Sequence, residues 1–183
     1  MEKLKENKRI FYIPGWMDIG EIYGFKNNLD IWDNEINLDE RIDADTVIAH
    51  SLGSVALLYN WNIYRNFRII LINPVFVKDN IFIRWSKYII FEGVRSPVKR
   101  IKLMLFAVPA FYKAMKLFSI PVVDIINIVP HDKITIIMGE KDRYLCDKRI
   151  VNSLEKKGVD VVRVKNAGHN YNSNIEDEIM KIL

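Results

Sequence analysis

Three side chains have the types and the chain order that nucleophilic acyl transfer needs: Ser51, Asp142 and His169. In such a set, the histidine takes the proton of the serine hydroxyl and later protonates the leaving group. The carboxylate holds the imidazole in one tautomer and stabilises its charged form. These residue types therefore predict cleavage of an acyl bond through a covalent acyl-serine intermediate.

The residues around Ser51 predict a tight turn between a strand and a helix. Residues 46–49, Thr-Val-Ile-Ala, are short and largely β-branched, as in a buried strand. Residues 52–64 have apolar side chains at helical spacing. A nucleophile on such a turn needs small residues two positions before and after it, and Ala49 and Gly53 meet this requirement. The alternative is a serine that only caps the helix.

Each of the other two residues follows a predicted strand, at 133–138 for Asp142 and at 159–164 for His169. Because the carboxyl ends of parallel strands meet at one edge of a sheet, we expect both side chains to lie near the serine. Glu140 follows the same strand as Asp142 and remains the alternative acid.

The position of each of the three histidines distinguishes their roles. His50 lies inside the turn, so its side chain should point away from Ser51. His131 precedes a strand and therefore belongs to the amino edge of the sheet, which is the wrong edge. His169 is the predicted base. Cys146 is expected to be a helix residue rather than a nucleophile, because no histidine is left to activate it.

The transition state of acyl transfer places negative charge on the carbonyl oxygen. Backbone amides must stabilise this charge by donating hydrogen bonds to it. One donor should be the amide of Leu52, directly after the serine. The second should be the amide of Trp16 in the turn after the first strand, where Gly15 allows a close approach. Met17 is an alternative donor. The Trp16 ring could wall the acyl pocket, or it could simply pack in a tight turn.

The remaining elements alternate between strands and helices. We expect further strands at 9–13 and 67–72 and a connecting loop at 34–45. Helices are predicted at 19–32, 143–157 and 173–183, the last with Ser173 and Glu176 as a capping box. This order predicts an α/β fold with a mostly parallel sheet covered by helices on both faces. The length of 183 residues fits one domain, 1–183.

An inserted helical segment, about 76–124, is predicted to cover the carboxyl edge as a lid. Its aromatic residues are candidates for the acyl pocket, together with Trp16; they could equally form the core of the insertion. The candidates are Phe82, Trp85, Phe106 and Phe111.

Basic residues concentrate in the same insertion. Residues 76–120 contain nine lysines and arginines and two acids, whereas the whole chain has a formal net charge of +4. Such a segment favours an acidic partner or an anionic surface. Candidates for binding an acidic carrier are Arg95, Lys99, Arg100 and Lys102. Attachment to a membrane surface is an open alternative, and the absence of a recognition motif argues against a nucleic-acid partner.

The N-terminal residues 1–9 are charged and lack the apolar stretch of a signal peptide. No uninterrupted apolar run approaches the ~18 residues of a spanning helix. The single cysteine fits a reducing compartment. Together these observations predict a cytoplasmic protein.

The motifs together resemble the α/β-hydrolase superfamily. They are Pro14-Gly15-Trp16, the turn at 49–53, and Asp142 followed by Gly168-His169. The resemblance is to compact bacterial serine esterases, which also have a segment like Ile72-Asn73-Pro74 after the third strand. It implies a carboxylesterase that uses a Ser-Asp-His triad and needs no cofactor or metal.

The basic, apolar insertion is also similar to that of the esterases that demethylate pimeloyl-acyl-carrier-protein in biotin biosynthesis. That resemblance implies an ester bound to an acidic acyl carrier protein instead of a free small molecule. A thioesterase or acyltransferase would use the same triad. A non-catalytic binding module on a hydrolase fold is the alternative from another class.

Overall fold

The computed structural model describes residues 9–16, 25, 28, 43–77, 79–93, 108–109 and 111–183. Apart from Phe25 and Asn28, the predicted helix at 19–32 lies outside these residues, as does most of the predicted loop at 34–45. Neither Phe25 nor Asn28 is helical, and Asn28 forms a parallel β-bridge with Tyr12. Among the helices of the described ranges, none combines the length and the apolar character needed to cross a membrane.

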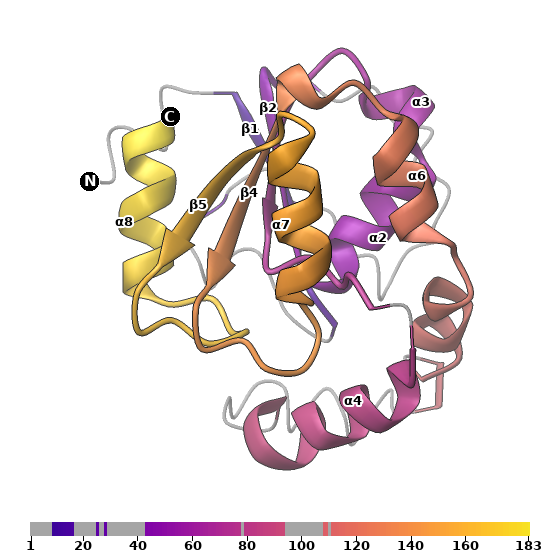
Figure 1. Ribbon diagram of the computed structural model, residues 1–183. Coiled ribbons are helices and arrows are strands. Elements are labelled where there is room, and N and C mark those ends of the chain that lie inside the picture. Colours follow the sequence, from indigo (N-terminus) through magenta and orange to yellow (C-terminus); the bar gives the residue numbers. More distant parts are fainter. Residues whose placement is uncertain are drawn as a thin grey trace.

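Five parallel strands form one sheet in their chain order. They are β1 (Ile10–Ile13), β2 (Thr46–His50), β3 (Arg68–Ile72), β4 (Ile134–Gly139) and β5 (Asp160–Val164). Each strand pairs in parallel with the next, so all the carboxyl ends lie at one edge. In Figure 1 this edge is the lower one, where the arrowheads of β4 and β5 lie.

The strands are apolar on both sides because both faces of the sheet are covered. In β2, Val47 and Ala49 join one hydrophobic cluster, and Ile48 joins the other. In β3, Leu71 joins the first cluster and Ile70 joins the second. Alternation along a strand sends successive side chains to opposite faces, so short β-branched runs without polar interruption encode this central position.

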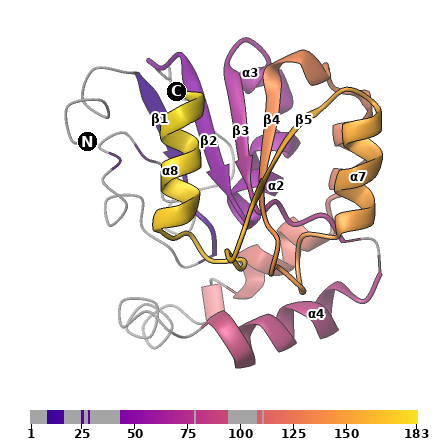
Figure 2. The ribbon, with the colours of Figure 1, turned by 60° about the vertical axis from the view of Figure 1, so that its left-hand side comes forward.

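Within the described residues, the helices that belong to the larger cluster cover one face of the sheet, and α8 (Ser173–Ile182) packs on the other face. The first group comprises α2 (Leu52–Tyr59), α3 (Trp61–Tyr64), α6 (Val122–Ile128) and α7 (Lys148–Lys156). Helix α8 packs through Ile175 and Ile179 against the opposite face, as Figure 2 shows. The α/β fold predicted from the sequence is therefore confirmed.

The predicted start of one helix, at residue 143, is wrong. Helix α7 begins at Lys148 rather than at 143, with Asp147 as its N-cap accepting a hydrogen bond from the Arg149 amide. Cys146 consequently precedes the helix, in a bridge with Phe76, and is not a helix residue.

Helix α8 is capped by Asn172 instead of Ser173. The Asn172 side chain accepts a hydrogen bond of 3.1 Å from the Ile175 amide. Asparagine is an N-cap of the same rank as serine, and its position one residue earlier displaces the predicted capping box with Glu176. The predicted helix at 52–64 is divided at Asn60 into α2 and α3.

The described part of the insertion lies along the carboxyl edge of the sheet. It contains α4 (Ile81–Tyr88), a π-helical turn η2 (Ile89–Gly93) and helical residues 111–118. Helix α4 runs below the strand ends in Figure 1. The helical character predicted for the insertion at about 76–124 is confirmed for these residues.

Candidate active site

Ser51 occupies a strained turn at the carboxyl end of β2. Its φ of 53° and ψ of −122° lie in a region that non-glycine residues rarely adopt. Its amide donates a hydrogen bond of 2.9 Å to the Ile72 carbonyl, which ties the turn to β3. Strain of this kind collects at functional sites, where the surrounding structure enforces it.

The turn is held between β1 and α2 by close packing. A Cβ atom on Gly53 would lie 2.5 Å from the Ile13 carbonyl oxygen and 2.6 Å from that of Pro14. Only glycine therefore permits α2 to start this close to the end of β1. The predicted need for a small residue at this position has a direct structural cause.

The structure brings Ser51, His169 and Asp142 into one line of hydrogen bonds. The Ser51 hydroxyl donates to His169 Nε2 at 2.7 Å, and His169 Nδ1 donates to Asp142 Oδ2 at 2.6 Å. All three residues are buried, with exposed fractions of 5%, 0% and 2%. In this geometry the imidazole can take the serine proton while the carboxylate fixes its tautomer.

The surroundings of Asp142 favour its ionised form despite its burial. Its Oδ1 accepts hydrogen bonds from the Tyr144 and Leu145 amides at 3.1 and 3.3 Å. Burial by itself would raise the pKa of this carboxyl, but the charge and hydrogen bond of His169, with the two amides, hold the pKa below its ordinary value. Glu140, the alternative acid, is exposed and makes no such contact with His169.

Asn73 connects the segment that leads to Asp142 with the segment that carries His169. The prediction from sequence gave Asn73 no role. It is fully buried at the end of β3, with a φ of 41°. Its side-chain amide donates to the Gly168 and His169 carbonyls at 2.9 and 2.8 Å. Its Oδ1 accepts from the Gly139 amide at 2.7 Å. The available signal was a polar residue directly after an otherwise apolar strand, beside the serine turn.

Two further side chains contact the candidate base. The Nε2 of His50 donates to the His169 carbonyl at 3.0 Å, so this histidine supports the loop through its backbone. The ring of Tyr88, on α4, meets the His169 ring edge-on with centroids 4.8 Å apart. The Tyr88 hydroxyl donates to Asn170 Oδ1 at 2.7 Å. His131 lies before β4, at the opposite edge, as predicted.

The turn after β1 lies beside the serine, where the oxyanion hole was predicted. A Cβ atom on Gly15 would lie 3.0 Å from the Ser51 Cβ, which shows how closely the backbone approaches. Trp16 follows and is 8% exposed. Leu52 is the first residue of α2, where amides have no partner within the helix. Met17 lies outside the described residues.

The residues predicted for the acyl pocket occupy different positions. Trp85 is buried and meets Trp16 edge-on at 5.1 Å between centroids. Phe82 and Phe111 are 47% and 51% exposed. Phe106 lies outside the described residues, as do all four predicted carrier-binding residues, Arg95, Lys99, Arg100 and Lys102.

A cavity of about 450 Å³ lies between α6 and α7, and an adjoining one of about 440 Å³ lies at the loop that carries Asp142. They share Arg84, Asp147 and Arg149, and Ser51 lines neither of them. Burial raises the pKa of the Cys146 thiol at the wall of the second cavity, and the nearby carboxylates of Asp142 and Asp147 raise it further. A thiol in this setting is a poor nucleophile.

The fold is that of known α/β-hydrolases. A carboxylesterase of the thaumarchaeon Nitrososphaera gargenis matches with a TM-score of 0.60 and 14% identity, over 96% of this chain and 88% of that one. BioG from Haemophilus influenzae matches with a TM-score of 0.53 and 14% identity, over 87% of each chain.

E-2-(acetamidomethylene)succinate hydrolase matches with a TM-score of 0.55 and 14% identity, over 93% of this chain and 87% of that one. No protein-family model matches the chain, and no curated protein matches it in sequence. At these identities the likeness shows the α/β-hydrolase fold.

Proposed function

We propose that this protein is a serine hydrolase that cleaves carboxylic esters with an apolar acyl group. The observation that carries the proposal is the buried line from Ser51 through His169 to Asp142, with hydrogen bonds of 2.7 and 2.6 Å. The fold supports it as well, since a carboxylesterase and another hydrolase are among the similar structures.

The reaction would proceed in two steps. The Ser51 oxygen attacks the ester carbonyl carbon as its proton moves to His169 Nε2, and the tetrahedral oxyanion faces the amides of Leu52 and Trp16. Collapse breaks the bond to the alcohol oxygen, which takes the proton from His169. Water then repeats the sequence on the acyl-serine and releases the acid.

An apolar acyl group is supported by the aromatic side chains next to the serine turn. Trp16 lies directly after Gly15, and Trp85 of α4 packs against it. Trp85 in turn contacts Phe111 and Phe118, with centroids 5.6 and 5.2 Å apart. The surroundings of the serine turn on this side are therefore aromatic, and an acyl chain placed against them would gain from leaving water.

The first experiment is labelling with a fluorophosphonate, which reacts with an activated serine. We expect one adduct by intact mass on the wild type and none on Ser51→Ala. Ser153→Ala is the matched control, because it removes an exposed serine of α7 far from the line of hydrogen bonds. An adduct that persists in Ser51→Ala would overturn the assignment of the nucleophile.

A panel of substrates then defines the leaving group. It contains p-nitrophenyl esters of increasing acyl length, the matching thioesters, and a methyl ester carried on acyl carrier protein. The same triad serves all three classes, so the ratio of their kcat/KM values distinguishes esterase from thioesterase and free from carrier-linked substrate. Folded wild type that neither labels nor hydrolyses any of them would favour the non-catalytic binding module.

A further inference from the structure

Exposed hydrophobic side chains gather on the insertion. Of the large hydrophobic residues that are exposed within the described ranges, all but Tyr59 and Ile128 belong to it. We call these residues the insertion face: Phe82, Ile83, Ile90, Phe91, Val108, Phe111 and Tyr112. Single exposed hydrophobic residues are ordinary, but a group of this size on one segment indicates a binding surface.

Helix α4 and the turn that follows are apolar on two sides. Trp85 and Tyr88 are 4% exposed and pack against Trp16 and against the candidate base His169. Ile83 and Ile90 are 56% and 73% exposed. A surface helix that only covers a core has polar residues on its outer side. The outer side of this segment instead carries exposed Ile83 and Ile90 beside Ser86 and Lys87, so it combines apolar and cationic side chains.

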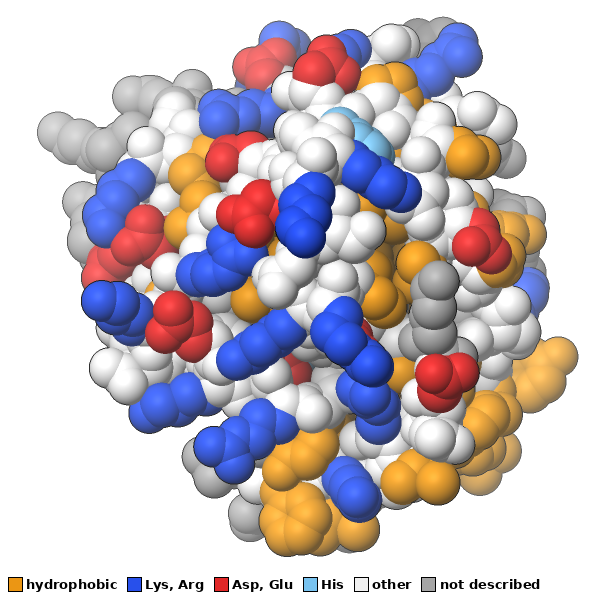
Figure 3. Space-filling view, viewed as in Figure 1, with side chains coloured by type: hydrophobic (Ala, Val, Ile, Leu, Met, Phe, Trp, Pro, Cys, Tyr) orange, Lys and Arg blue, Asp and Glu red, His pale blue; other side chains and the backbone are white. Residues whose placement is uncertain are grey.

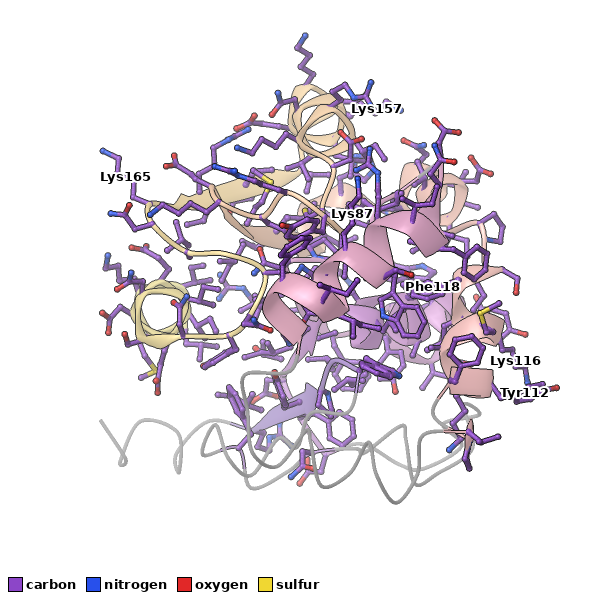
Figure 4. The ribbon with its side chains drawn as sticks, turned by 90° about the horizontal axis from the view of Figure 1, so that it is seen from below. Lys87, Tyr112, Lys116, Phe118, Lys157 and Lys165 are labelled. Carbon is purple, nitrogen blue, oxygen red and sulfur yellow. The ribbon has the colours of Figure 1, made fainter. Side chains whose placement is uncertain are left out.

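The two helical parts of the insertion face adjoin each other. Phe82 of α4 meets Phe118 edge-on with centroids 6.1 Å apart, and Trp85 contacts both Phe111 and Phe118. Figure 4, seen from below, shows α4 beside Phe118, with Tyr112 and Lys116 further along the same side. These contacts place α4 and the helical residues 111–118, which carry most of the insertion face, side by side.

Basic residues accompany the insertion face. Lys87 and Lys116 are exposed and Lys113 is half-buried in the same helices, whereas Arg84 of α4 pairs with Asp147 at 3.7 Å. Residues 76–120 contain nine basic residues against two acids. In Figure 3, orange hydrophobic side chains lie along the lower edge over the insertion, with blue Lys and Arg side chains next to them. Aromatic, aliphatic and cationic side chains together are the composition that binds at the boundary of an anionic bilayer.

We propose that the insertion face docks onto a membrane surface that contains anionic lipids. A second copy of the chain is disfavoured as the occupant, because a symmetric contact would bring the lysines of both copies together. The proposal rests on the proposed function and extends it, because α4 lies between this surface and His169. An ester lipid leaving the bilayer would thus reach the carboxyl edge of the sheet, where Ser51 lies.

The test is co-sedimentation of the full chain with sucrose-loaded vesicles. Vesicles of phosphatidylcholine alone are compared with vesicles containing phosphatidylglycerol, at low and at high salt. We expect the wild type to pellet with the anionic vesicles at low salt and to be released as salt rises, since surface charges are screened. Equal amounts in the supernatant with and without anionic vesicles at low salt would overturn the proposal.

Paired variants locate the surface. Lys87→Gln with Lys116→Gln should lower the partition coefficient about tenfold or more, and Ile83→Asn with Ile90→Asn should also lower it. The matched controls are Lys156→Gln and Ile128→Ser, an exposed lysine of α7 and an 83% exposed isoleucine of α6 at the other edge. If the control variants reduce vesicle binding and the paired variants do not, the assigned surface is wrong.

Two further readouts distinguish the possible failures. Ser51→Ala should sediment like the wild type, because Ser51 lies outside the insertion face. Wild type that binds the vesicles but hydrolyses no ester would contradict only the hydrolase assignment. If light scattering shows a dimer that Ile83→Asn with Ile90→Asn dissociates, and no vesicle binding occurs, the insertion face belongs to a second copy. If an acidic carrier protein binds this face and vesicles do not, a protein partner replaces the lipid surface.

Discussion

The side-chain amide of Asn73 donates a hydrogen bond of 2.8 Å to the carbonyl oxygen of His169, 96 positions further along the chain. The same side chain holds Gly168 and the end of β4 at Gly139. One amide group therefore fixes the loop of the candidate base relative to the strand that leads to the acid. Asn73 contacts no reacting atom and is a positioning residue.

We predict that Asn73→Ala lowers both stability and turnover. Three hydrogen bonds are lost and buried backbone groups are left without partners, which costs about 1–3 kcal/mol in unfolding free energy. The kcat for a p-nitrophenyl ester should fall while KM changes little. The reason is that His169 loses its orientation, whereas the contacts between the site and the substrate are kept. Urea unfolding and steady-state kinetics measure the two effects.

The matched control for Asn73 is Asn166→Ala. Asn166 has a φ of 62° but is exposed, so this variant introduces the same backbone strain without loss of buried hydrogen bonds. Equal losses of kcat in the two variants would mean that backbone strain, and not the side-chain amide, explains the effect.

Substitutions of Ser51, His169 and Asp142 should lower kcat by different amounts. Ser51→Ala and His169→Ala each delete a group that moves in the reaction, and we expect kcat to fall by about four orders of magnitude or more. Asp142→Asn keeps the shape and should cost about two to four orders of magnitude. Circular dichroism checks the fold of each variant. Wild-type turnover in His169→Ala would contradict the assigned base.

The ionisation of Asp142 should make the fold sensitive to acid. Its pKa in the folded protein lies below the ordinary 3.8, so the ionised carboxylate stabilises the folded state. This contribution is complete above the ordinary pKa and is lost as pH falls through the folded-state pKa. Asp142→Asn should therefore be less stable than the wild type at pH 7, with the gap closing below about pH 4.

Urea midpoints between pH 7 and pH 3 measure this difference. Glu140→Gln is the control, because it removes an exposed acid from the same loop and leaves the buried carboxylate in place. A gap between wild type and Asp142→Asn that stays constant over the whole range would contradict the linkage.

The two glycines near the serine should respond differently to alanine. At Gly53 the added methyl group would meet backbone carbonyl oxygens at 2.5 and 2.6 Å, and Gly53→Ala should cost about 2 kcal/mol or more of stability. At Gly15 it would meet the His50 and Ser51 side chains at 3.0 Å, so Gly15→Ala should fold and lose activity. Thermal melts with an ester assay separate the two effects, and an unchanged melting temperature for Gly53→Ala would contradict the close packing.

The sequence by itself determined the fold class and where along the chain the strands lie. Short β-branched runs such as 46–49 and 134–137 are encoded locally, because burial on both faces requires apolar side chains at successive positions. The position of Ser51 followed from its small neighbours, and His169 followed from strand order, since parallel strands end at the same edge. The predictions for Phe106 and for Arg95, Lys99, Arg100 and Lys102 fall outside the described residues.

The tertiary structure alone decided which groups meet. The choice of Asp142 over Glu140 depends on the direction in which each side chain leaves the turn after β4, which spacing does not specify. The role of Asn73 and the contact of Tyr88 with His169 depend on strand register and on how α4 crosses the sheet edge. The start of α7 at Lys148 depends on the amides that Asp142 binds before the helix begins. Such contacts join distant residues, and local sequence patterns encode elements but not the geometry between them.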